Sequence, residues 1–223
     1  MWFDRFMMGC HSRMGDIVKK DFAVSIEVRH ELMRCLDWDW DRSTTREEKH
    51  SNAEIGKFCV VCFCSMLRGE EIVMMEMSGI VDSYDLSGRA ATPHVIVPFL
   101  GRFKNEEGLV RHRKLLLVDV TRSGLEPQKW MGRLLETNLA KGMRCVFVFW
   151  NPDSTNAKAS YFRKRFLDRL YNVQQGTDLI SMDLDVYEEY GERRSLRREV
   201  DKHAQNLNID PTCIELMARW RLK

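Results

Sequence analysis

The stretch from Glu54 to Leu67, Glu-Ile-Gly-Lys-Phe-Cys-Val-Val-Cys-Phe-Cys-Ser-Met-Leu, holds the longest apolar run of this chain. Its apolar residues recur at helical spacing on one side, and further apolar residues fill the other side. The first set is Ile55, Cys59, Cys62, Phe63 and Met66, and the second is Val60, Val61 and Cys64. A helix that is apolar nearly all round is buried by its neighbours on every side. The stretch therefore predicts a central helix over residues 54–67.

Three cysteines of this helix, Cys59, Cys62 and Cys64, invite comparison with a zinc site. A structural zinc site needs four ligands, and no second Cys-x-x-Cys or His-x-x-x-His pair accompanies them. We therefore interpret them as small apolar residues of the core and expect no metal. The stretch Gly101–Gly108 is too loose for a nucleotide-binding loop, so we expect no cofactor.

The composition is that of an ordinary globular protein, with 223 residues, of which 44% are hydrophobic and 30% are charged. This composition excludes disordered and low-complexity proteins, and the length suits one domain. No apolar run approaches the roughly 20 residues that a bilayer helix needs, so we expect no membrane span. Seven cysteines cannot all pair, and the amino terminus lacks the pattern of a secretory signal. We therefore expect reduced thiols and an intracellular location.

A hairpin is predicted beyond the central helix. His94–Pro98 and Lys114–Val120 are rich in Val, Ile and Leu, as strands are, and a charged tip at Gly101–Gly108 separates them. The polar stretch Asp82–Thr92 is typical of a loop.

Further helices follow from capping residues and apolar spacing. They are predicted at about Pro127–Lys141, Ala157–Gln175, Leu196–Leu207 and Asp210–Trp220. The inner face of the second of these is formed by Phe162, Phe166, Leu170 and Val173. The expected fold class is mainly α with a small antiparallel β-sheet, an α+β fold.

The formal net charge is only +2, but the basic residues are unevenly placed. They gather in three runs, at Arg102–Lys114, Lys158–Arg169 and Arg193–Lys202, while acidic residues gather between Glu27 and Asp41. One such run is most often a solvated helix face. Three runs in one chain favour an anionic partner such as nucleic acid.

Arg68 leaves the predicted central helix in the sequence Ser65-Met-Leu-Arg-Gly-Glu-Glu71. An arginine in such a dry and rigid place needs an anionic partner, and Glu71 follows three residues later to orient it. Two interpretations remain open at this point. The pair is either structural, or it holds a guanidinium ready for a phosphate.

Four phrases of the chain, taken together, resemble the catalytic domain of tyrosine recombinases of the phage-integrase type, and most closely the recombinase-like proteins of eukaryotic mobile elements. The phrases are Leu67-Arg-Gly-Glu-Glu71, Gly101-Arg-Phe-Lys104, Arg193-Arg-Ser-Leu-Arg-Arg198 and Ile214-Glu-Leu-Met-Ala-Arg-Trp220. Their order and spacing carry the resemblance, which extends from Gly9 to Trp220. We accordingly assign residues 1–223 to one domain, with 1–50 as an N-terminal helical part, 51–223 as the core that carries the motifs, and no separate core-binding domain.

The resemblance implies a role for each matching residue. Arg68 and Arg197 would grip the non-bridging oxygens of the scissile phosphate, most tightly in the pentacoordinate transition state. Lys104 would protonate the departing 5′ oxygen, and Trp220 would donate its ring N–H to the phosphate. Glu71 would orient Arg68 without touching DNA. Further contacts to double-stranded DNA are expected from Arg102, Arg193, Arg198, Lys202 and Arg219.

The chain departs from the family at three positions. Arg194 takes the place of a histidine, so a fixed cation replaces a proton acceptor. Glu199 stands where glycine is usual and brings a negative charge close to Arg197. The family's nucleophile is a tyrosine after the tryptophan, whereas the five tyrosines of this chain precede Trp220 and are interpreted as core or surface residues. We therefore expect a chain truncated before the nucleophile, with none of its own.

The expected function is that of a DNA-binding domain from a DNA recombination or integration protein of a mobile element. The family activity is strand cleavage and rejoining through a 3′-phosphotyrosine, and this chain is expected to be inactive alone. Other recombinase protomers as partners and a nuclear location are expected with it. One alternative is a non-catalytic, domesticated module that only occupies DNA. Another is an unrelated helical interaction domain whose charged runs are coincidental.

Overall fold

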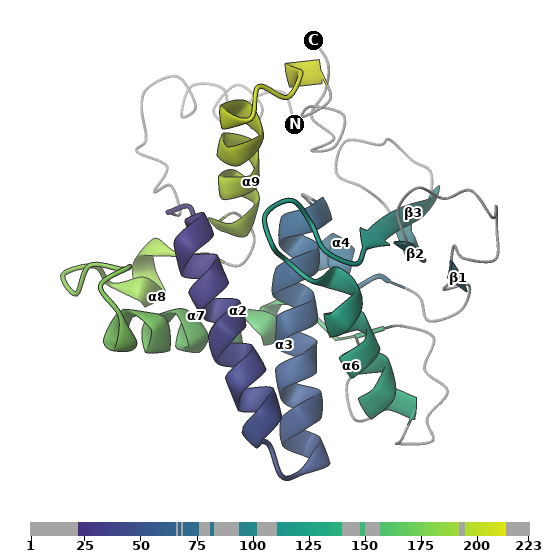
Figure 1. The fold of residues 1–223 in the computed structure, drawn as a ribbon, viewed down its shortest axis with the longest axis horizontal. Coiled ribbons are helices and arrows are strands. Elements are labelled where there is room, and N and C mark those ends of the chain that lie inside the picture. Colours follow the sequence, from purple (N-terminus) through teal and green to yellow (C-terminus); the bar gives the residue numbers. More distant parts are fainter. Residues whose placement is uncertain are drawn as a thin grey trace, which may run out of the picture.

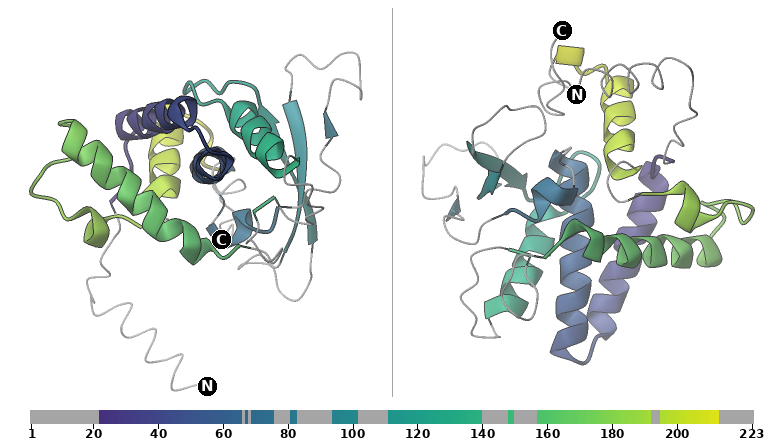
Figure 2. Two further views of the ribbon diagram at one scale, coloured as in Figure 1. Left: turned by 90° about the horizontal axis from the view of Figure 1, so that it is seen from below. Right: turned by 180° about the vertical axis from the view of Figure 1, so that it is seen from behind.

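The computed structural model describes residues 22–65, 67, 69–75, 81–82, 94–101, 111–139, 148–149, 157–191 and 195–212. Within these ranges the fold is built around helix α3 (Arg46–Ser65), of which every residue from Asn52 to Phe63 is buried (Figure 1). Figure 2 (left) shows α3 end-on, surrounded by α2 (Ile26–Arg42), α6 (Pro127–Leu139) and α7 (Ala159–Gly176). The predicted central helix is confirmed.

Helix α3 begins earlier than the apolar pattern predicted, at Arg46 and not at Glu54. Its start is a capping box: the Glu48 backbone N–H donates to Thr45 Oγ1 at 3.3 Å, and the Glu48 carboxylate accepts from the Thr45 N–H at 3.2 Å. These hydrogen bonds lower the pKa of Glu48. The boundary that we placed after residue 50 therefore falls inside a continuous helix.

Of the predicted N-terminal part, residues 1–50, the structure describes residues 22–50, and these include helix α2. Ser25 caps it, because its hydroxyl accepts a hydrogen bond from the Val28 N–H at 3.3 Å. Val28, Leu32 and Leu36 form its buried stripe, and the helix packs against α3. Figure 1 shows the two helices side by side, joined by a short turn at Ser43–Thr45.

A three-stranded antiparallel sheet stands beside α6, in the strand order β1 (Val81–Asp82), β2 (His94–Gly101), β3 (Arg111–Val118). The predicted hairpin is confirmed, and its register runs from His94 opposite Val118 to Gly101 opposite Arg111. Both strands reach further toward the charged tip than the apolar pattern indicated. Asp82, which we expected in a loop, pairs with Val95. The Gln128 side-chain amide donates to the Leu117 carbonyl at 3.0 Å and ties the sheet to α6.

The predicted helix after residue 157 is confirmed as α7, and the one near 196 as α9 (Ser195–Asn206). The four predicted inner residues of α7 are buried, and Phe162 stacks on Phe58 of α3 at 4.5 Å between ring centroids. Two four-residue helices, α4 (Gly69–Ile72) and α8 (Val186–Glu189), were not predicted, because so short an element carries no period. Of the helix predicted at 210–220, all but residues 210–212 lies outside the described ranges.

The mainly α fold with a small antiparallel sheet is thus confirmed. None of the helices in the described ranges combines the length and the apolar character that crossing a bilayer requires.

Gly56 is the position at which α3 accepts the side chain of Trp130 from α6. A Cβ atom at Gly56 would stand 2.7 Å from Trp130 Cδ2 and closer still to Cε3 and Cζ3. We expect Gly56→Ala to lower the free energy of unfolding by about 3 kcal/mol, because a fully buried indole has no room to yield. Urea unfolding followed by circular dichroism measures this. The matched control is Gly132→Ala on α6, where a Cβ meets nothing within 4 Å and helix propensity favours alanine by up to about 1 kcal/mol. Equal effects of the two substitutions would contradict the packing described here.

Lys57 of α3 is fully buried, and its ammonium group has no hydrogen-bond partner among the residues that the structure describes. Desolvation lowers the pKa of Lys57 from 10.5 to about 7. Between about pH 7 and pH 8.5 the unfolded chain therefore binds one more proton than the folded protein, so the free energy of unfolding should rise with pH, by up to about 1.4 kcal/mol per unit. Above that range, burial raises the pKa of Cys59 to about 12 and that of Cys64 to about 11, which opposes the rise.

The substitution Lys57→Met removes the titrating group and keeps the length of the side chain. We expect it to raise the free energy of unfolding at pH 7 and to flatten the rise between about pH 7 and pH 8.5. Urea unfolding at three pH values for both proteins is the measurement. A wild-type stability that stays level over this range would show that the ammonium group is not desolvated.

Candidate functional site

The predicted phosphate-gripping residues lie only partly within the described structure. Outside it fall Arg68, Lys104, Arg194 and Trp220, together with Arg102, Arg193 and Arg219. Inside it, Glu71 is a half-buried residue of α4, Lys202 is exposed on α9, and α9 also carries the backbone of Arg197 and Arg198. The described elements that carry or flank these residues are α4, the β2–β3 hairpin and α9.

These elements gather at one end of the molecule. Helix α4 follows the C-terminal end of α3, the β2–β3 hairpin stands beside it, and α9 lies above the same end (Figure 1; Figure 2, right). Contacts of α3 with both α4 and α9 hold the arrangement together. The turn between α2 and α3 lies at the opposite end. Residues from three distant parts of the sequence are thus brought to a common end of the central helix.

The backbone on either side of Arg68 is anchored in the core. Ser65 ends α3, and its hydroxyl donates to the Val61 carbonyl at 2.5 Å and accepts from the Leu67 N–H at 3.2 Å. Leu67 is buried, and Gly69 lies so close under Phe58 that an added Cβ would stand 3.1 Å from its ring carbon Cζ. The chain before and after Arg68 therefore has little freedom to move.

Helix α9 is anchored on one side of its first turns. Leu196 is buried at 1% exposure, and Val200, four residues further on, packs against the same core. This i, i+4 pair fixes the rotation of α9 about its axis. Lys202 lies exposed in the next turn. The residue of the predicted basic motif that is anchored in the core is therefore the apolar Leu196.

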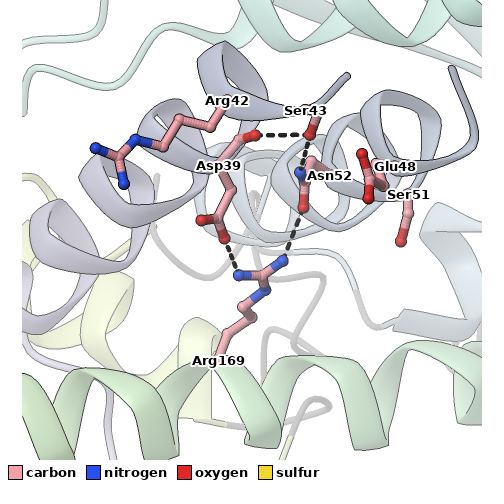
Figure 3. Close-up of a pocket in the computed structure, with 7 residues that line it drawn as sticks. All are labelled: Asp39, Arg42, Ser43, Glu48, Ser51, Asn52 and Arg169. Carbon is pink, nitrogen blue, oxygen red and sulfur yellow. Dashed lines mark hydrogen bonds and ion pairs between the residues drawn. The ribbon is translucent and has the colours of Figure 1, made fainter. Parts of the chain in front are cut away.

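The middle basic run has a different role from the one its charge suggested. Arg165 donates to Glu54 Oε2 at 3.1 Å and to the Ser51 hydroxyl at 2.6 Å. Arg169 binds Asp39 and donates to Asn52 Oδ1 at 2.7 Å (Figure 3). The interpretation of this run as a solvated helix face is wrong for both arginines. They tie α7 to α2 and α3.

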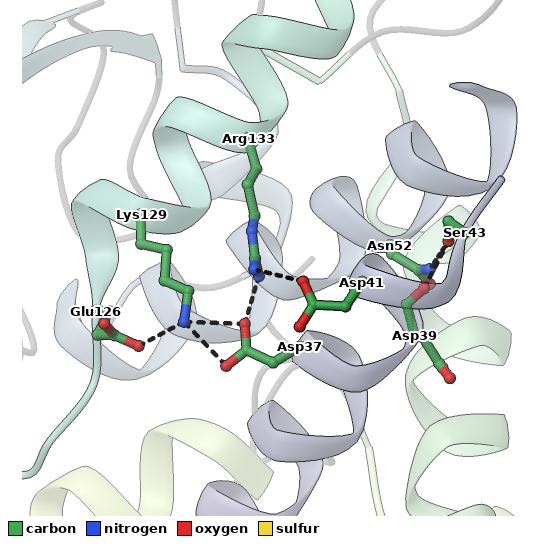
Figure 4. Close-up of polar contacts among 8 residues, drawn as sticks. All are labelled: Asp37, Asp39, Asp41, Ser43, Asn52, Glu126, Lys129 and Arg133. Carbon is green, nitrogen blue, oxygen red and sulfur yellow. Dashed lines mark hydrogen bonds and ion pairs between the residues drawn. The ribbon is translucent and has the colours of Figure 1, made fainter. Parts of the chain in front are cut away.

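The acidic residues of α2 also form ion pairs that join one helix to another. Asp37 accepts from Lys129 Nζ at 3.1 Å and pairs with Arg133, both on α6 (Figure 4). Lys129 also pairs with Glu126 at 2.9 Å. Acidic side chains of α2 are thus bound to basic side chains of α6 and α7, which balances the charge at the α2–α3 end of the molecule.

A polar hollow of about 340 Å³ opens at this end, beside the α2–α3 turn (Figure 3). Its lining residues are Asp39, Arg42, Ser43, Glu48, Ser51, Asn52 and Arg169. Its lining carries two carboxylates and two guanidinium groups, so the hollow has no net charge with which to attract a phosphate. It lies far from α9, and we assign it no role in the site.

The described tyrosines are core or surface residues, as predicted. Tyr161, Tyr171 and Tyr187 are exposed, whereas Tyr190 is buried. A hydrogen bond from the Tyr187 hydroxyl to Asp168 at 2.8 Å raises the pKa of Tyr187, and desolvation raises the pKa of Tyr190. Both shifts disfavour the phenolate that attacks phosphorus. Tyr84 lies outside the described ranges.

Cys59 and Cys62 of α3 are core residues, as predicted, and Cys64 is partly buried and packs against the core. Cys59 and Cys62 are buried at 1% and 2% exposure. Burial raises the pKa of the Cys59 thiol to about 12, so the thiolate that binds metal is disfavoured. In the part of the chain that the structure describes, no three His, Cys, Asp or Glu side chains come together as metal ligands would.

The internal role of Arg165 has a direct consequence for stability. Arg165→Ala leaves the Glu54 carboxylate, exposed by only 4%, without its guanidinium partner. We expect the free energy of unfolding to fall by about 3 kcal/mol. The control is Lys164→Ala, which removes an exposed charge from the same run and should change it by less than about 0.5 kcal/mol. If the two variants unfold at the same urea concentration, Arg165 is not a structural tie.

Comparison with known proteins bears on the fold. No protein-family model matches the chain, and no curated protein matches it either. Solved structures do match. One is the XerH site-specific recombinase in a post-cleavage complex with its palindromic difH substrate, at 9% identity and a TM-score of 0.57. The match covers 92% of this chain and 48% of that one, so this chain spans about half the length of XerH.

Two further structures give the same result. The Tn1549 transposon integrase in complex with circular intermediate DNA matches at 11% identity and a TM-score of 0.54, over 99% of this chain and 67% of the integrase. A λ integrase dimer bound to a COC′ core site matches at 8% identity and a TM-score of 0.50, over 91% and 58% of the two chains. At these identities the likeness is one of fold. The chain has the fold of a tyrosine recombinase catalytic domain, which the order of its motifs predicted.

Proposed function

We propose that this chain is a single-domain DNA-binding module of a tyrosine recombinase from a mobile element. It binds double-stranded DNA through the phosphate backbone at the end of the molecule where α4, the β2–β3 hairpin and α9 meet. The observation that carries the proposal is this gathering of the three motif-bearing elements within the recombinase fold. The solved structures with this fold include complexes with DNA, which supports the same partner here.

The proposed site surrounds one phosphate. Arg68 and Arg197 supply two guanidinium forks for its non-bridging oxygens, because a planar fork matches two such oxygens at once. Glu71, which lies in the turn of helix directly after Arg68, orients that fork. Lys104 serves as general acid for the departing 5′ oxygen, and the Trp220 indole N–H donates to the phosphate.

Arg194 adds a third fixed cation where related recombinases carry a histidine. It strengthens phosphate binding but cannot accept a proton, so proton transfer at this position is lost. Additional phosphate contacts come from Arg102, Arg193, Arg198, Lys202 and Arg219. Exposed Lys202 lies one turn after Arg198 on α9, a spacing that suits neighbouring phosphates of one strand.

Cleavage needs a tyrosine that this sequence does not place after Trp220. In the proposed reaction, the tyrosine hydroxyl attacks phosphorus, the 5′ oxygen leaves with a proton, and a 3′-phosphotyrosine forms. The bond energy is kept in this link, so the reaction needs neither metal nor nucleotide. We propose that the chain binds DNA and acts with other recombinase protomers in the nucleus of its host.

A non-catalytic module that only occupies DNA is the second candidate. The replacement of the usual histidine by Arg194 favours it, since it keeps affinity while removing proton transfer. The two candidates share the phosphate site and differ in whether adding a C-terminal tyrosine segment restores covalent protein–DNA adducts. The third possibility, an unrelated interaction domain, has no support from the fold.

DNA binding is tested with a generic duplex at about 50 mM and about 200 mM salt. Each phosphate contact adds about 0.9 to the slope of log affinity against log salt, so several contacts should weaken binding at least about a hundredfold over this range. We expect Arg68→Ala and Arg197→Ala each to lower the affinity at least about tenfold and to reduce the slope by about one contact.

The control is Arg34→Ala on α2. Arg34 is an exposed arginine that donates to Glu31 at 2.6 and 2.7 Å, away from the proposed site. It should change the affinity by less than about twofold, because a distant surface charge is screened. A wild-type protein that fails to bind at low salt would reject DNA as the partner of the chain. Equal losses for Arg34 and Arg68 would reject the site.

A further inference from the structure

Helix α7 has a solvent-facing side that the other described elements leave open. Its members follow one another at intervals of three or four residues and so share one side of the helix: Tyr161, Lys164, Asp168, Tyr171 and Gln175. Asp168 is partly exposed and the other four are exposed. Figure 2 (right) shows α7 lying across α2 and α3, with α8 bordering one end of it. We call this side the α7 outer face.

The second half of the α7 outer face is acidic. Residues 170–191 contain five Asp and Glu residues and no Lys, Arg or His. Asp178, Asp183 and Asp185 are exposed. The first half is basic, because exposed Lys158 and Lys164 belong to it. The two halves of one helix face therefore carry opposite charge.

This distribution of charge does not serve the helix itself. The helix macrodipole favours acidic residues in the first turn and basic residues in the last turn. Helix α7 has no acidic residue in its first turn and no basic residue in its last turn. Its basic half instead lies toward the N-terminal end and the acidic segment follows the C-terminal end. A charge pattern that gives the helix no support is better explained by a partner surface.

The acidic half is held rigidly. The side-chain amide of buried Gln174 donates to the carbonyls of Ser181 and Leu184, at 2.6 and 2.8 Å, and so fixes the loop between α7 and α8. Met182 of this loop is 64% exposed, and its Sδ lies 3.9 Å from Gln175 Nε2. An apolar side chain displayed on a fixed loop loses little conformational freedom when a partner covers it.

Three exposed tyrosines stand along the same surface. The rings of Tyr171 and Tyr187 lie 5.9 Å apart, and the Tyr187 hydroxyl donates to Asp168 at 2.8 Å. Tyr161 lies in the basic half, where its ring packs against Phe162 at 5.1 Å between centroids. Tyrosines are enriched at protein–protein interfaces, where a ring is buried and its hydroxyl stays hydrogen-bonded. The face therefore has apolar area as well as charge to offer a partner.

We propose that two copies of this chain associate through their α7 outer faces, antiparallel about a two-fold axis. A face with one basic and one acidic half is complementary to itself when one copy is turned by a half rotation. With the axis between residues 164 and 168, Lys164 of each copy meets the partner's Asp168, and Tyr161 meets the partner's Tyr171. The inference goes beyond DNA binding and does not depend on it.

The test is sedimentation equilibrium of the chain without DNA, from about 1 to about 300 µM. A contact between two single helices is small, so we expect a dimer with a dissociation constant on the order of 10 µM. Raising the salt from about 50 to about 500 mM should weaken it severalfold, because the charges are screened. Protein at about 1 µM stays monomeric, which is the concentration for the unfolding measurements on Lys164→Ala.

Charge reversal assigns the contact to α7. Lys164→Asp and Asp168→Lys should each weaken self-association at least about tenfold, because like charges then meet across the axis. An equimolar mixture of the two variants should restore the dimer to within about threefold of wild type, since both contacts of the mixed pair join opposite charges. Circular dichroism shows that each variant is folded.

The matched controls are Arg122→Asp and Glu136→Lys. Both reverse an exposed charge, one before α6 and one on it, across α3 from α7. They should leave the dissociation constant within about twofold of wild type.

Four results would overturn the inference. The first is a wild-type chain that stays monomeric up to about 300 µM. The second is a dimer that neither reversal weakens, which would place the contact on another surface. The third is failure of the mixed variants to associate. The fourth is a monomeric chain whose duplex affinity falls at least about tenfold with Lys164→Asp, which would assign the basic half to DNA. Failure of DNA binding alone would reject the proposed function and leave the dimer standing.

Discussion

The burial of α3 on every side is the constraint on which the rest of the structure depends. A helix with no solvent face must be covered by several elements, and α2, α6, α7 and α9 all contact it. Close packing follows, with Trp130 seated on Gly56 and Phe162 stacked on Phe58. The guanidinium of Arg29 lies over the Phe63 ring at 3.4 Å. Because every neighbour is fitted to α3, the elements that leave its C-terminal end are held in fixed relation to one another.

Burying α3 also brings polar side chains into the interior, and these decide how charge is distributed over the molecule. His50 binds the Thr137 hydroxyl at 3.0 Å, and Glu54 and Asn52 take arginines of α7 as partners. Four basic side chains of α6 and α7 are thereby used inside the protein or paired with acids of α2, namely Lys129, Arg133, Arg165 and Arg169. The ion-paired end beside the α2–α3 turn lies opposite the end of α3 where α4, the β2–β3 hairpin and α9 gather.

The segments that bear motif residues share one feature, which is a neighbour anchored in the core. Each described segment that bears one lies next to residues anchored in the core: Leu67 and Gly69 flank Arg68, and Leu196 precedes Arg197. The hairpin is anchored through Val97 and Leu117, both fully buried. For the proposed phosphate site, segments with such rigid ends would lose little conformational entropy when a phosphate binds.

The sequence by itself determined the central helix, the hairpin, α7 and the fold, because apolar spacing reports burial directly and the order of the motifs is a property of the chain. It also contained the capping box at Thr45, which apolar spacing alone overlooks. Only the tertiary structure decided that Arg165 and Arg169 are bound inside the protein. The partners of Arg165 and Arg169 lie more than a hundred residues away in the sequence, at separations of 111 to 130. A local sequence pattern cannot reveal these pairings, because they form only when α2, α3 and α7 pack together.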